Sequence, residues 1–130
     1  MAIDDDIKSE VDAILSTTWD VTDGTAVPAT DDIKLQGGGR KLDVVMLYVD
    51  LADSTALVSY NKQMAAKILK SFLSSCTRLI RHNGGHIRSF DGDRVMGVFI
   101  GDTKNSSAAK TALNIKWVFD EILKPKLKAQ

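Results

Sequence analysis

The stretch "HIRSFDGDRVMGVFI" (residues 86–100) carries the strongest fold signal in the chain. An Asp-Gly pair at 91–92 separates two runs of strand-forming residues, 86–90 and 93–100, and such a pair is typical of tight turns between antiparallel strands. This turn accounts for Asp91, because aspartate suits the first turn position. It does not account for Asp93, which begins a strongly apolar strand. The sequence therefore predicts a β-hairpin with one unexplained carboxylate.

Upstream of the hairpin, the chain predicts a buried strand followed by a long helix. "LDVVMLYVD" (42–50) is a nearly continuous apolar run of the kind found in central strands. "DST" (53–55) offers N-cap residues for a helix that reaches about His82, and "NGG" (83–85) ends it with Gly84 as a left-handed C-cap. The helix has an apolar stripe with a period of four residues, which includes Met64, Ile68, Phe72 and Cys76.

Downstream of the hairpin, we expect one more helix, from about Asn105–Ser106 to a stop before Pro125. Its predicted apolar residues are Ala109, Ala112, Leu113, Val118 and Ile122. The order strand, helical crossover, hairpin, helix is that of an α+β, ferredoxin-like (split βαβ) core, with an antiparallel sheet and the helices on one face.

In a split βαβ arrangement the first strand lies antiparallel to the second hairpin strand. The end of "VVMLYVD" then meets the start of "DRVMGVF", which brings Asp50 and Asp93 together. Two carboxylates at one sheet end repel each other unless a positive charge lies between them, and divalent cations favour oxygen ligands of this type. Ordinary turn acids remain the alternative interpretation of both residues.

The segment after Asp50 is a candidate phosphate site. Residues Leu51, Ala52, Asp53, Ser54 and Thr55 ("LADST") lead from a strand end into a predicted helix start. Backbone N–H groups at helix N-termini commonly bind phosphates, so this segment is expected to hold a triphosphate.

Residues 1–40 differ in character from the rest of the chain. They contain a predicted short helix with Ile7, Val11, Ile14 and Leu15 on one face, followed by turn-rich sequence, and are interpreted as an arm that packs on the domain or on a partner. We therefore divide the chain into an N-terminal helix and arm (1–40), a core (41–124) and a tail (125–130).

Composition excludes several classes of protein. Lys plus Arg and Asp plus Glu both number 17, so the formal net charge is zero, which does not favour binding to nucleic acid or to an anionic membrane. The chain shows no signal peptide and no apolar run long enough to span a bilayer. Its single cysteine, Cys76, lies on the apolar helical stripe and is expected in the core. The default expectation is a soluble, cytoplasmic protein.

The motifs "YVDLADSTALV" and "GGHIRSFDGDRVMGVF", separated by a long helix, resemble the class III nucleotidyl cyclase catalytic domain over about residues 42–124. The resemblance implies two divalent cations, Mg²⁺ or Mn²⁺, held by Asp50, Asp93 and the backbone of Leu51. It also implies a nucleoside triphosphate substrate, a 3′,5′-cyclic nucleotide as product, and a homodimer with the active site at its interface.

Within this family the sequences of these motifs are most similar to those of the bacterial pyrimidine cyclases of the Pycsar anti-phage systems. Purine cyclases usually carry Lys or Glu four positions before the hairpin Asp, and here that position is Ser89. Tyr48 and Arg94 are similar to the residues near the base in the pyrimidine group, although a strand residue and a surface charge are the plainer interpretations. The resemblance implies UTP or CTP as substrate, with an adenylate or guanylate cyclase as the alternative. Of the two pyrimidines UTP is favoured, because it presents one more carbonyl than CTP to the fixed donors of Arg94.

One part of the family pattern has no counterpart in this chain. Class III domains continue into strands that supply a transition-state Asn and Arg, whereas this sequence ends at "KPKLKAQ". The core is therefore expected to be incomplete at its C-terminus. The expectation is either a piece of a longer cyclase or a short, catalytically impaired module for nucleotide binding or dimerisation.

Overall fold

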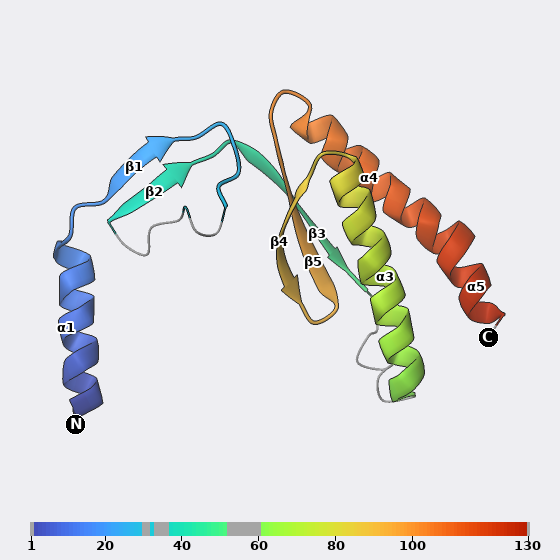
Figure 1. The fold of residues 1–130 in the computed structure, drawn as a ribbon, viewed down its shortest axis with the longest axis horizontal. Helices are drawn as coiled ribbons and strands as arrows, with labels where there is room; N and C mark the ends of the chain where they lie inside the picture. The colour runs from blue at the N-terminus through green and yellow to red at the C-terminus, as the bar shows by residue number, and fades with distance from the viewer. Residues whose placement is uncertain (1, 30–31, 33–36, 52–60, 130) are drawn as a thin grey trace. The chain divides into compact units, whose positions relative to one another are not determined.

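The computed structural model describes residues 2–29, 32, 37–51 and 61–129 (Figure 1). The chain divides into two compact units, Met1–Asp43 and Val44–Gln130. None of the described helices is both long enough and apolar enough to cross a membrane.

The first unit contains a helix and a small sheet. Helix α1 (Ala2–Ser16) precedes strands β1 (Asp20–Asp23) and β2 (Gly38–Lys41), which pair in parallel. The expected helix is present, and it has no buried residue. Its apolar side chains are spaced about one turn apart and are exposed: Ile3, Ile7, Val11 and Leu15.

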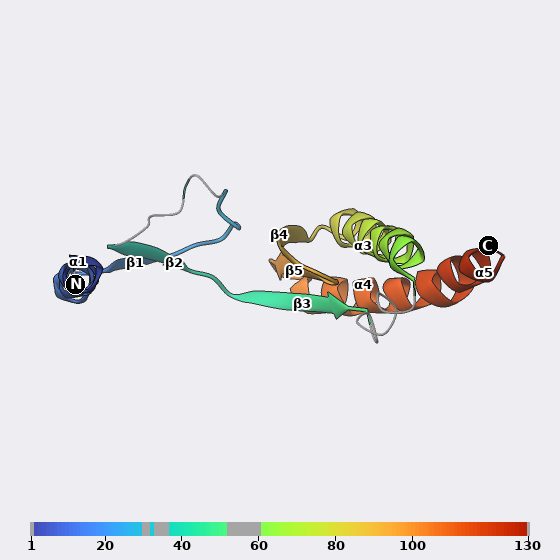
Figure 2. The same ribbon diagram turned by 90° about the horizontal axis from the view of Figure 1, so that it is seen from below.

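The second unit is a three-stranded antiparallel sheet with two long helices. The strands are β3 (Val44–Asp50), β4 (His86–Asp91) and β5 (Arg94–Ile100), in the order β3-β5-β4. Helices α3 (Lys62–His82) and α4 (Lys104–Val118) pack against each other beside this sheet (Figures 1 and 2). The predicted α+β core, with its antiparallel sheet and helices on one face, is confirmed.

The core lies between the helices and one face of the sheet. Alternate residues of β3 and β5 point into it, among them Leu47, Val95 and Phe99, where they meet Phe72 and Ile80 of α3. None of the described helices of this unit covers the other sheet face, which we call the open face. Toward the end of the sheet where Asp50 and Asp91 are paired with Arg94, the residues on this face are Met46, Tyr48, Asp50, Ser89, Asp91, Arg94 and Met96.

Helix α3 has well-defined ends. Asn61 is extended (φ −155°), and its side-chain oxygen accepts a hydrogen bond from the Met64 N–H at 3.1 Å, so the helix begins at Lys62. The prediction of one continuous helix from 53–55 is therefore wrong at Asn61, and residues 52–60 lie outside the described part. At the other end Gly84 (φ 84°) takes the predicted left-handed C-cap position.

The last helix begins at Lys104, close to the predicted start, but its end differs from the prediction. It continues through a π-helical turn (Phe119–Leu123) into α5 (Lys124–Lys128) instead of stopping before Pro125. Proline is tolerated there because it stands in the first turn of α5, where no N–H donor is required.

The core-facing side of α4 is also different from the expected one. Ala108, Thr111 and Ile115 face the core, whereas Leu113 is 72% exposed. The expected residues Ala109, Ala112 and Ile122 are exposed as well, and Val118 is half-buried. A weakly amphipathic helix gives a poor sequence signal for its buried side, and here a buried threonine occupies a core position.

Candidate active site

The structure places the backbones of Asp50 and Asp93 at the same end of the sheet. Asp50 is paired with Arg94 across β3 and β5. One residue further on, the Leu51 N–H donates a hydrogen bond to the Asp93 carbonyl oxygen at 3.4 Å. The two residues that the sequence placed together are therefore neighbours in space.

The hairpin turn lies one residue later than predicted. Strand β4 ends at Asp91, the two-residue turn is Gly92–Asp93, and β5 begins at Arg94. Gly92 has φ 61°, and a glycine in the first central position suits a two-residue hairpin turn. The interpretation of Asp91 as a turn residue is therefore wrong. Asp91 is a strand residue opposite Arg94, and the turn residue is Asp93.

Arg94 lies between two carboxylate-bearing positions on the open face. Its Nε is 3.8 Å from Oδ2 of Asp50, and both side chains are about half exposed, at 54% and 56%. An exposed pair of this kind contributes about 0–1 kcal/mol. Asp91 is the partner of Arg94 on the opposite side, in β4. Arg94 therefore supplies the positive charge at this sheet end, through a weak contact that a ligand can displace.

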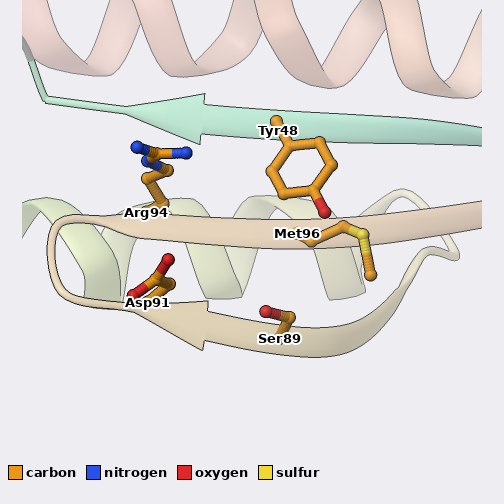
Figure 3. Close-up of a pocket in the computed structure, with 5 residues that line it drawn as sticks. All are labelled: Tyr48, Ser89, Asp91, Arg94 and Met96. Carbon is orange, nitrogen blue, oxygen red and sulfur yellow. The ribbon is translucent and has the colours of Figure 1, made fainter.

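A hollow of about 230 Å³ opens beside this row of charges. It is lined from all three strands by Tyr48, Ser89, Asp91, Arg94 and Met96 (Figure 3). A shift in register between Ile87 and Ser89 leaves Ser89 opposite Met96, and Tyr48 is opposite Met96 from the other side. The hollow is smaller than the ~300–1,000 Å³ typical of sites for drug-sized ligands, so it would hold part of a nucleotide, such as its base, and not the whole of it.

The sequence-predicted base contacts and the hollow largely coincide. Tyr48, Ser89 and Arg94 were singled out from the sequence, whereas Asp91 and Met96 were missed. Period-two alternation from Ser89 would have found Asp91, since residues 89 and 91 share a sheet face. Because Asp91 was assigned to the turn instead of to the strand, this alternation was not applied to it.

The oxygen donors at the strand end suit a divalent cation. Asp50 and Asp93 offer carboxylates, and Leu51 offers a backbone carbonyl. The described residues contain no group of three or more His, Cys, Asp or Glu side chains placed to hold a metal. Mg²⁺ usually takes one or two carboxylates and completes its shell with substrate phosphates and water, so this set fits. The other predicted phosphate contacts, Ala52, Asp53, Ser54 and Thr55, lie outside the described residues.

A larger hollow of about 530 Å³ lies elsewhere in the same unit. It is lined by residues of α3 and α5, with Lys67, Lys70 and Lys126 as its charged groups. Its described lining residues include no carboxylate, no cysteine and no predicted site residue. The chemistry-bearing residues therefore point to the open face of the sheet as the candidate active site.

Comparisons with known proteins give relatives along the whole chain. No protein-family model matches it. Three curated proteins named "Uridylate cyclase" do: that of Rhodovulum sp. (strain MB263) is 44% identical over 100% of this chain, that of Xanthomonas perforans 39% over 100%, and that of Burkholderia cepacia 41% over 96%. The chain spans 55%, 57% and 56% of those proteins, respectively.

A solved structure of a bacterial light-regulated adenylyl cyclase is also similar, with 29% identity and a TM-score of 0.49 over 55% of this chain and 20% of that one. The sequence matches to the uridylate cyclases are the stronger finding, since they extend over essentially all of this chain. As the resemblance carried by the two aspartate motifs leads us to expect, the chain is similar over essentially its whole length to curated proteins named uridylate cyclase.

Proposed function

We propose that this chain is part of a nucleotidyl cyclase that converts UTP into 3′,5′-cyclic UMP and pyrophosphate. The observation that carries the proposal is the meeting of Asp50 and Asp93 at one sheet end, directly beside a ring-sized hollow. Identity of 39–44% with proteins named uridylate cyclase supports it. As in the pyrimidine cyclase resemblance, the product would serve as a second messenger in anti-phage defence.

Asp50, Asp93 and the Leu51 carbonyl would hold two divalent cations, Mn²⁺ or Mg²⁺. Bound there, the cations would lower the pKa of the ribose 3′-hydroxyl and neutralise charge on the triphosphate. The two carboxylates would act as ligands and not as proton donors. Their contribution is to fix the place of the triphosphate relative to the sheet.

The reaction is intramolecular. The ribose 3′-oxygen bonds to the α-phosphorus, the bond from that phosphorus to pyrophosphate breaks, and the hydroxyl proton passes to solvent water. A base held in the hollow fixes the ribose next to the strand end, so that the attacking oxygen and the α-phosphorus stay close. Positioning of this kind can supply a large part of a rate enhancement.

Side chains of the hollow suit a pyrimidine better than a purine. Tyr48 supplies an aromatic wall and Arg94 a fixed fork of N–H donors for base carbonyls. When a cation binds the Asp50 carboxylate, Arg94 would lose its weak contact with Asp50 and would be free to donate hydrogen bonds to the base. Ser89 stands where a long charged side chain would contact a purine, so adenylate or guanylate cyclisation is the less favoured alternative.

The test is a turnover assay of the protein that contains this chain, with UTP, CTP, ATP and GTP in the presence of Mn²⁺. We expect cyclic UMP as the main product. The variants Asp50→Asn and Asp93→Asn should each lower its formation by at least about 100-fold, because each removes a charged ligand from the reacting centre. Asp102→Asn, an exposed aspartate away from the site, serves as the matched control and should retain activity.

Two outcomes would overturn parts of the proposal. Full turnover in either site variant would contradict the metal-ligand roles, and faster production of cyclic AMP than of cyclic UMP would contradict the pyrimidine assignment. UTP binding without any turnover would favour the impaired nucleotide-binding module. The homodimer with a shared site is tested in the same preparation, by measuring the mass in solution with and without UTP.

A further inference from the structure

Asp91 is the charged residue of the hollow to which the proposed function gives no role. It ends β4, faces the same hollow as Tyr48 and Arg94, and is exposed (Figure 3). Nothing in the turn requires it, since the turn consists of Gly92 and Asp93. A carboxylate in a ring-sized hollow lined by one arginine is therefore a feature to be explained.

Cross-strand geometry places Asp91 beside the predicted base contact. Asp91 and Arg94 are direct partners, and such partners have Cβ atoms about 4.5–5.5 Å apart on the same sheet face. Ser89 lies on that face two residues earlier in the same strand. The hollow thus offers N–H donors from Arg94, a hydroxyl from Ser89 and an acceptor from Asp91.

We propose that Asp91 selects UTP over CTP by accepting a hydrogen bond from the ring N–H of uracil. This inference rests on the proposed function. An ionised carboxylate is an acceptor only, whereas an arginine is a donor only. Uracil presents a ring N–H between two carbonyls, so one donor and one acceptor side chain, placed next to each other, match neighbouring atoms of its edge.

A cytosine held in the position of uracil does not match the same pair, and it would have to shift by one ring atom to bring its N4 amino group to the carboxylate. Its ring N3 is an acceptor, so a carboxylate placed there would face a lone pair and remain without a hydrogen bond. Sites built to hydrogen-bond one group reject an analogue that lacks it, because their own polar groups are then left unpaired. Guanine also carries a ring N–H beside a carbonyl, so this inference concerns the choice between UTP and CTP and not the choice against GTP.

The decisive variant is Asp91→Asn, whose amide has the same shape but can donate as well as accept. With UTP we expect kcat/KM to fall by about tenfold or more, because the amide either replaces a charge-assisted hydrogen bond by a weaker neutral one or turns its own N–H group toward the ring N–H. With CTP it should change little or rise, because the amide can donate to the cytosine N3. The ratio of kcat/KM for UTP to that for CTP should therefore fall at least about tenfold, while Asp102→Asn leaves the ratio unchanged.

Other results have distinct meanings. A carboxylate that only anchors Arg94 would lower kcat/KM for both substrates by the same factor in Asp91→Asn, and this result would overturn the inference. A wild-type protein that makes neither cyclic UMP nor cyclic CMP would contradict the proposed function instead. If Asp91→Asn does not fold by circular dichroism, Asp91→Ser is used, and an unchanged UTP-to-CTP ratio there would equally overturn the inference.

Discussion

A single methyl group at Gly97 should destabilise the sheet unit measurably. Gly97 is buried in the central strand β5, and a Cβ added to it would lie 2.8 Å from Cγ2 and 3.2 Å from Cδ1 of Ile80. Ile80 is fully buried, so it has no free space into which to move. In Gly97→Ala either the helix α3 or the strand must shift.

Overpacking of this kind costs about 1–3 kcal/mol. For a unit of this size, each kcal/mol corresponds to about 4–8 °C in Tm, so the midpoint should fall by about 5–20 °C. Thermal unfolding followed by circular dichroism measures the shift. Gly39→Ala is the control for the chemical change itself, because a Cβ added at Gly39 has no neighbouring atom within 4 Å.

A double-variant experiment isolates the contact. In an Ile80→Ala background the vacated space can accept the new Cβ, so adding Gly97→Ala should cost little or even recover some stability. The steric reasoning would be refuted by a Tm for Gly97→Ala within 1 °C of wild type, where 1 °C is about the precision of the measurement. It would also be refuted by an equal penalty in both backgrounds.

Two further predictions concern buried polar groups. Burial raises the pKa of the Cys76 thiol from 9.0 to about 12. Above pH 9 the unfolded chain therefore loses this proton more readily than the folded one, so the free energy of unfolding should fall as the pH rises toward 12. Urea titrations at several pH values measure this fall, and the contribution of Cys76 to it should be absent in Cys76→Ala. Thr111 is fully buried, donates to the Ser107 carbonyl at 2.7 Å and accepts from Nδ2 of Asn83 at 2.8 Å. Thr111→Val should therefore cost about 1–2 kcal/mol in the same titration, and no change would show that the tether between α3 and α4 is dispensable.

The sequence predicted the sheet better than it predicted the helices around it. The apolar run identified β3 as a strand, but the prediction of a buried central strand is wrong: β3 lies at the edge of the described sheet, and its residues Met46 and Tyr48 are exposed. The pairing of Asp50 with the start of β5 followed from topology. The buried side of α4 was missed, because Thr111 and Ala108 do not identify themselves as core residues by hydrophobicity. Their burial is decided by packing against α3.

The error at Asp91 has a different cause. In the sequence Asp91-Gly92-Asp93 the two-residue turn can be either Asp91–Gly92 or Gly92–Asp93, and the residue types alone do not decide between these two positions of the turn. A one-residue change in the turn reassigns Asp91 from the loop to the sheet. The structure resolves this choice through the pairing of Asp91 with Arg94, and the hollow becomes visible only after that pairing is known.

The one-sided sheet has a consequence for how such proteins can diversify. Strands β3 and β5 alternate between residues that hold the helices, such as Val95 and Phe99, and residues such as Tyr48 that face outward. Substitutions at the outward positions remove little buried packing, so they escape the usual conflict between new activity and stability. A substitution at an outward position such as Tyr48 can therefore change what the open face contacts, while the residues that pack against the helices keep the fold.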